Sequence, residues 1–102
     1  MDLDKMQESA RTASELLKLL GHPDRLMVLC QLKGGEQSVG QLSENVGIKQ
    51  SALSQHLARM RHLGVVDSRR DAQTIYYSIS GDKVKRIVSV VYELYCAEQS
   101  GA

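Results

Sequence analysis

Two short helix-like segments, joined by a tight turn and followed at once by a strand pattern, restrict the fold of this chain more than any other feature. Residues 39–46 and 50–63 carry apolar residues at helical spacing, and the stretch GIKQ joins them. The spacing then changes, because VVDSRR and TIYYSI are rich in β-branched and aromatic residues. This order predicts a helix-turn-helix followed by a β-hairpin wing.

Three further helices are predicted around this unit, at residues 4–20, 23–33 and 82–98. The segment 23–33 is apolar nearly all round, so we expect it to be the central, buried helix. Pro23 suits its first position, although His22 before it is a poor cap, whereas Ser38 is a good cap for the third helix. We therefore expect one domain over residues 1–102. Its class is mainly α with a β-hairpin wing, in the order of four helices, two strands and a last helix.

The net charge of +1 says little about partners, but the charge is unevenly distributed. The block 49–70 is mostly basic, with Lys49, Arg59, Arg61, Arg69 and Arg70 against Asp67 alone. Such a block is an electrostatic footprint for phosphate. We expect Gln50, Ser51, Ser54 and Gln55 to reach base edges, Arg59 to reach a base or phosphate, and Arg69 and Arg70 to grip the backbone or the minor groove. The alternative is that these side chains form an ordinary solvated surface.

Three stretches of the chain resemble the ArsR/SmtB family of bacterial winged-helix repressors: LGHPDRLMVLCQL, SVGQLSENVGIKQSALSQHLARMRHLGVV and RRDAQTIYYSI. The resemblance covers nearly the whole chain. It implies a homodimer that binds double-stranded operator DNA and pairs through its first and last helices. Broad apolar faces on those two helices agree with such pairing. We expect the dimer interface, or the core beside it, to contain Leu17, Val88, Val91 and Leu94.

Better-known members of that family sense metals, but this chain offers few ligands for one. The stretch SVGQL supplies no thiolate or imidazole near the third helix, and the last helix has no His. His22, His56 and His62 lie on other segments, and we expect His56 and His62 to pack or contact phosphate. No metal site and no cofactor are therefore expected.

The two cysteines lie far apart in the sequence, Cys30 in the second helix and Cys96 near the end of the last. Free cysteines are often simply buried. Their contexts, LCQL and LYC, resemble the dithiol branch of the same family, with its BigR-, SqrR- and HlyU-type regulators. That resemblance implies that the two thiols meet within one protomer and become linked when they react with persulfides or polysulfides. No Lys or Arg appears beside either thiol to activate it; Tyr92 is a candidate neighbour.

Several alternatives stay open. Within the same class, the chain could sense oxidants through a plain disulfide, respond to a metal or haem, or counteract another repressor. A thiol enzyme is disfavoured because the chain has no C-x-x-C, no Gly-rich phosphate loop and no local Cys/His pair. A dimerisation module that binds no DNA is disfavoured by the basic block. Without a membrane-spanning run or a signal-peptide pattern, the chain is expected to be cytoplasmic.

Overall fold

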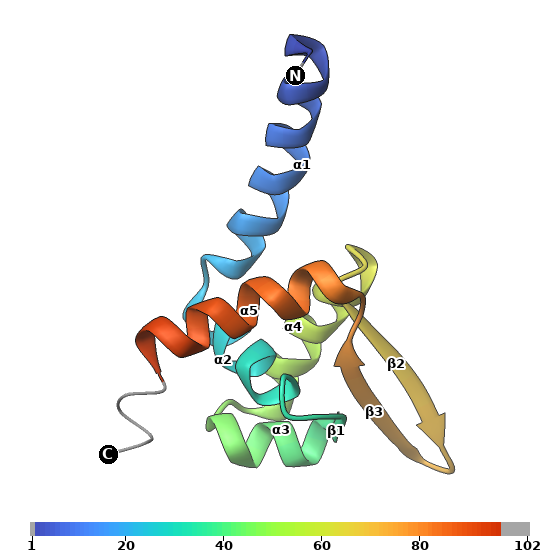
Figure 1. Cartoon of the computed structure of the whole chain (residues 1–102). Helices are drawn as coiled ribbons and strands as arrows, with labels where there is room; N and C mark the ends of the chain where they lie inside the picture. The colour runs from blue at the N-terminus through green and yellow to red at the C-terminus, as the bar shows by residue number, and fades with distance from the viewer. Residues whose placement is uncertain (1, 97–102) are drawn as a thin grey trace.

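A computed structural model of the chain describes residues 2–96, which form five α-helices and three strands (Figure 1). The elements follow one another as α1 (Leu3–Leu20), α2 (Pro23–Leu32), β1 (Gln37–Ser38), α3 (Val39–Val46), α4 (Gln50–His62), β2 (Val66–Asp71), β3 (Thr74–Ile79) and α5 (Asp82–Tyr95). This is a winged helix-turn-helix, as the sequence predicts. The predicted end of the last helix at residue 98 lies outside the described residues. Among residues 2–96, no helix combines the length and apolar character needed to cross a bilayer.

The short helices begin and end where local chemistry dictates. Ser38 and Gln41 form a reciprocal capping box at the start of α3, which confirms the predicted cap. Gly47 ends α3 in the left-handed region, at φ 70°, which a side chain would disfavour. The prediction for His22 was wrong, because its Nδ1 accepts a hydrogen bond from the backbone N–H of Asp24 at 3.1 Å. An imidazole nitrogen thus caps the N-terminus of α2, a role that a Ser or Thr hydroxyl more often fills.

The core packs α4 against α2 and α3. Leu53, Leu57 and Met60 are fully buried on one face of α4, as the spacing predicts. Val28, Leu29 and Leu32 of α2 are buried in the same cluster, which confirms α2 as the central helix. Burying each such side chain contributes about 1.5–3 kcal/mol. The core therefore fixes which face of α4 remains outside.

The predicted two-stranded hairpin of the wing is confirmed, and a third strand extends it into a three-stranded antiparallel sheet. β2 pairs with β3 over six residues, from Val66 opposite Ile79 to Asp71 opposite Thr74. The strand β1, which was not predicted, pairs with the other edge of β3 and gives the order β1-β3-β2. Two residues carry too little of an alternating pattern to predict a strand. β1 matters because it ties the wing to the start of α3.

The helices α1 and α5 leave apolar surface uncovered in the single chain. In Figure 1, α1 projects away from the other helices and the wing, and α5 lies across the front of the remaining helices. Only Leu19 and Leu20 of α1 are buried, while Leu17 is 58% and Leu94 of α5 is 67% exposed. A groove of about 840 Å³ lies between these helices, and it is lined in part by Ala13, Leu16 and Val91. An extended apolar surface of this kind is typical of a protein–protein interface.

Candidate DNA-binding surface and dithiol site

The outer face of α4 presents every side chain that the sequence predicts to read DNA. Gln50, Ser51, Ser54, Gln55 and Arg59 are all exposed, whereas the buried stripe of α4 faces the hydrophobic core. Gln and Ser side chains can form hydrogen bonds with base edges in the major groove of DNA. The fold therefore gathers the predicted reading residues on one accessible helix face.

The turn before α4 is held by a side chain of α3. The Ser43 hydroxyl donates a hydrogen bond to the carbonyl of Ile48 at 2.6 Å, and the amide of Leu53 donates to the carbonyl of Lys49 at 2.9 Å. Ile48 also packs against the core. These contacts fix the angle at which α4 leaves α3.

A second brace joins α4 to the start of α2. His56 Nε2 lies 3.6 Å from the Asp24 carboxylate, and the rings of His22 and His56 are 4.8 Å apart. This group was not predicted from the sequence, because residue 56 is far from residue 22 along the chain. His62, the third histidine, lies exposed at the last position of α4.

The same three side chains also form a candidate metal-binding group, with ligand atoms within 4.8 Å of one another. Two atoms bound to one zinc ion at about 2.0–2.2 Å lie at most about 4.4 Å apart, so only atoms near the 4.8 Å limit would have to move closer to share it. In addition, His22 accepts the Asp24 amide through Nδ1, so its neutral ring carries the proton on Nε2. A metal would have to displace this cap. The arrangement therefore acts as a brace between α2 and α4.

The two wing arginines have different surroundings. Arg69 forms a bidentate ion pair with Glu36, at 2.6 and 2.7 Å, and its guanidinium lies 4.6 Å from the centroid of the Tyr76 ring. The hydrogen bonds from Arg69 lower the pKa of the Glu36 carboxyl. Arg70 is exposed and makes no ion pair with any residue between 2 and 96. From the sequence the two arginines were expected to act alike, and the role of Glu36 was not predicted.

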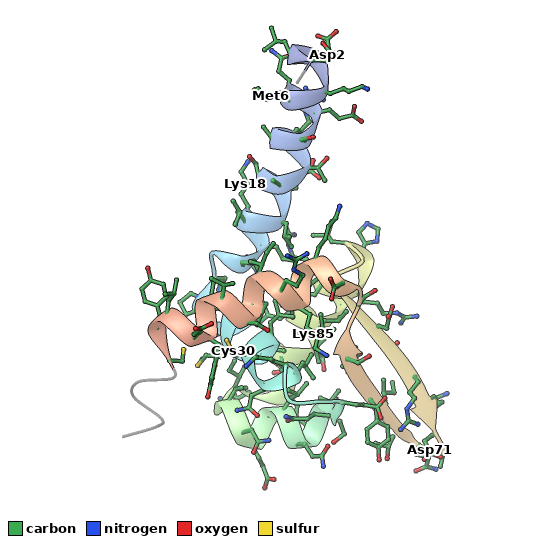
Figure 2. All side chains as sticks on the ribbon, in the orientation of Figure 1. Asp2, Met6, Lys18, Cys30, Asp71 and Lys85 are labelled. Carbon is green, nitrogen blue, oxygen red and sulfur yellow. The ribbon has the colours of Figure 1, made fainter. Side chains whose placement is uncertain are left out.

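The two cysteines lie together between α2 and α5, as the resemblance implied. Figure 2 shows Cys30 beside the C-terminal half of α5. The two cysteines are half-buried and form no disulfide, and a hydrogen bond joins their side chains. Burial raises the pKa of Cys30, and the charge of Cys96 and the hydrogen bond to it raise the same pKa further. Residues 66 positions apart in sequence thus form one site, which no local motif could show.

A lysine does stand beside this pair, contrary to the sequence analysis. Lys33 follows Cys30 by one helical turn, and its charge lowers the pKa of Cys30 against the larger opposing effects. Its Nζ lies 4.4 Å from the centroid of the Tyr92 ring. Tyr92 precedes Cys96 by one turn and accepts the Cys96 amide hydrogen bond at 2.8 Å. The dithiol site therefore includes a cation–π contact between the same two helices.

The residues predicted at the dimer interface divide between surface and core. Leu17 and Leu94 are exposed, and Val91 is half-buried in the groove between α1 and α5. Val88 is fully buried in the core of its own protomer. Three of the four are therefore available to a second chain, and Val88 supports them from beneath.

Comparison with known proteins shows extensive similarity. Residues 22–68 match the family described as bacterial regulatory protein, arsR family. The chain is 47% identical over 96 residues to the HTH-type transcriptional regulator YgaV of Escherichia coli, covering 93% of this chain and 97% of YgaV. It is 42% identical over 97 residues to the biofilm growth-associated repressor of Agrobacterium fabrum, covering 95% and 83% of the two chains. The solved structure of reduced HlyU from Vibrio cholerae superposes with a TM-score of 0.88 at 42% identity, covering 92% of this chain and 99% of that one.

Proposed function

The chain belongs to the arsR family of bacterial regulatory proteins, and we propose that it is a homodimeric transcriptional repressor whose DNA binding is switched by Cys30 and Cys96. Persulfides or polysulfides are the proposed inducers. The observation that carries this proposal is the hydrogen-bonded pair of thiols between α2 and α5. The helix α2 supports the helix-turn-helix, and α5 has an exposed apolar face. The chain acts as a cytoplasmic regulator and performs no catalysis.

DNA binding is supported by the outer face of α4 and by the wing. Gln50, Ser51, Ser54, Gln55 and Arg59 would read bases or contact phosphate, while Arg69 and Arg70 give the wing its positive charge. A relative that is a repressor by name favours repression as the direction of control. We therefore propose operator binding as the role of this winged helix-turn-helix.

Dimerisation is supported by the uncovered apolar faces of α1 and α5. A second copy would bury Leu17 and Leu94 and fill the groove that Val91 lines. A two-fold dimer places two α4 helices in successive major grooves, about 34–36 Å apart. Any change in the packing of α5 on α2 then alters the spacing of the two reading helices.

The switch chemistry needs only the two thiols and a sulfane sulfur donor. A thiolate attacks the outer sulfur of RSSH, which leaves a cysteine persulfide and RSH. The second thiol then attacks the inner sulfur of that persulfide, giving a disulfide and H₂S. If both cysteines are first persulfidated, they condense to a trisulfide and release H₂S. Each product links α2 to α5 covalently.

A plain oxidant sensor is the second candidate, because hydrogen-bonded thiols also suit a direct disulfide. The two candidates differ in the sulfur that the product retains. Intact-protein mass spectrometry, after separate treatment with cysteine persulfide and hydrogen peroxide, measures this directly. We expect additional sulfur between Cys30 and Cys96 after persulfide and slow reaction with peroxide. Rapid conversion to the disulfide by peroxide, with no sulfur retained after persulfide, would favour the oxidant sensor.

A further inference from the structure

One ion pair ties the wing to the start of the helix-turn-helix. Arg69 on β2 donates from Nε to Oε2 of Glu36 at 2.7 Å and from Nη2 to Oε1 at 2.6 Å. Two parallel charge-assisted hydrogen bonds fix the orientation of the guanidinium as well as its position. Glu36 directly precedes β1, on the far side of β3 from β2. The pair therefore reaches across the middle strand of the sheet.

The Tyr76 ring lies against this ion pair. Tyr76 is the Cα partner of Arg69 on one side of β3 and of Ser38 on the other. The guanidinium carbon of Arg69 is 4.6 Å from the ring centroid, within the range of a cation–π contact. Ser38 is the N-cap of α3, the first helix of the helix-turn-helix. The Glu36–Arg69–Tyr76 group thus sets the wing against the element that orients α4.

Arg70 provides an internal comparison. It pairs with Ile75 in the ladder, and the alternation of side chains along a strand sends it to the opposite face from Arg69. No residue in the described range 2–96 forms an ion pair with it. Its charge is therefore available to a phosphate. A phosphate that approached Arg69 would also meet the carboxylate of Glu36.

We infer that Glu36 and Arg69 are positioning residues for DNA binding, which hold the wing so that Arg70 contacts a phosphate. The inference rests on the proposed DNA binding by the wing and gives its two arginines separate tasks. Arg69 acts through the angle of the wing and makes no phosphate contact of its own. Glu36 is then part of the DNA-binding machinery although it carries a negative charge.

The salt dependence of binding separates the two tasks. The probe is a fluorescent duplex selected from a random-sequence library against the wild-type protein, and anisotropy is measured over a series of KCl concentrations. A lost phosphate contact reduces the slope of log K against log salt by about 0.9. We expect this reduction for Arg70→Gln. For Arg69→Gln and Glu36→Gln we expect an unchanged slope and about two- to fivefold weaker binding at every salt concentration, the size of effect of an exposed ion pair.

The exchange variant, Glu36→Arg combined with Arg69→Glu, keeps the pair but reverses its direction. We expect it to bind DNA more tightly than either single substitution to Gln, because the wing is again held. A slope reduced equally by Arg69→Gln and Arg70→Gln would overturn the inference, as would tighter binding by Glu36→Gln. If Arg70→Gln leaves the slope unchanged, the wing itself makes no phosphate contact, and the inference fails together with that part of the proposed function. All four variants should show the wild-type thermal transition within a few degrees, since all three substituted positions are exposed.

Discussion

Lys33 and Tyr92 join α2 to α5 beside the cysteine pair, with the ammonium nitrogen 4.4 Å from the ring centroid. Each lies one helical turn from a cysteine on its own helix, Lys33 after Cys30 and Tyr92 before Cys96. The contact therefore links the two helices without a covalent bond, at the place where the proposed switch would link them covalently.

We expect Lys33 to control the reactivity of Cys30. Its positive charge favours the thiolate, so Lys33→Gln should raise the pKa of Cys30 and move the pH profile of its alkylation to higher pH. The measurement is the rate of iodoacetamide labelling against pH in a Cys96→Ser background, where Cys30 is the only thiol. Lys33→Arg should keep the profile near that of its parent. Lys85→Gln, a substitution at an exposed position of α5, serves as the matched control. An equal shift of the alkylation profile in that variant would show that Lys33 has no specific effect on Cys30.

Gln55 and Ser51 should carry sequence discrimination rather than general affinity. Replacing either with Ala removes a hydrogen-bonding group from the exposed face of α4 while leaving its buried stripe intact. We expect a loss of about 1–3 kcal/mol in discrimination between selected and random DNA, with no change in salt slope. Competition binding with the two duplexes measures it. Full discrimination in both variants would show that α4 does not read bases through these residues.

A charge at Val91 should separate the dimer. Val91 lines the apolar groove between α1 and α5 and is only half-buried in the protomer, so Val91→Glu leaves the core in place. A carboxylate buried at an interface without a partner is strongly unfavourable. Sedimentation velocity should show monomer, and affinity for the selected duplex should fall with it. A dimer of wild-type stability in this variant would place the interface elsewhere.

Ser38→Ala should destabilise the protein by about 1 kcal/mol, because the amide of Gln41 loses its capping partner. Gln41→Ala removes only the bond from the Ser38 amide to the Gln41 side chain and keeps the bond from the amide of residue 41 to the Ser38 hydroxyl, so its effect should be smaller. Chemical denaturation measures both. Equal stability of Ser38→Ala and wild type would mean that the capping box contributes little.

The sequence predicts the elements well where the pattern is long and local. The stripe of Leu53, Leu57 and Met60, the cap at Ser38 and the change of period at the wing all follow from neighbours in the chain. The two-residue strand β1 was missed because its pairing with β3 depends on residues about 40 positions away.

In the candidate sites, too, contacts between residues distant in the sequence were not predicted. The exposure of Gln55 follows from the helical period. The ion pair of Arg69, in contrast, depends on Glu36, which lies 33 residues earlier in the chain. Nothing in the linear pattern distinguishes Arg69 from Arg70. Lys33 was overlooked for a different reason, since its spacing of three residues from Cys30 places it on the same helix face and was available from the sequence.

The proposed switch is tested most directly by release of bound DNA. The wild-type protein on the fluorescent selected duplex is treated with cysteine persulfide, and anisotropy is followed alongside Cys30→Ser and Cys96→Ser. We expect the wild type to release the duplex, and both variants to bind it when untreated and to retain it after treatment. Release by either variant, or retention by the wild type after mass spectrometry has shown the two cysteines linked, would contradict the dithiol switch.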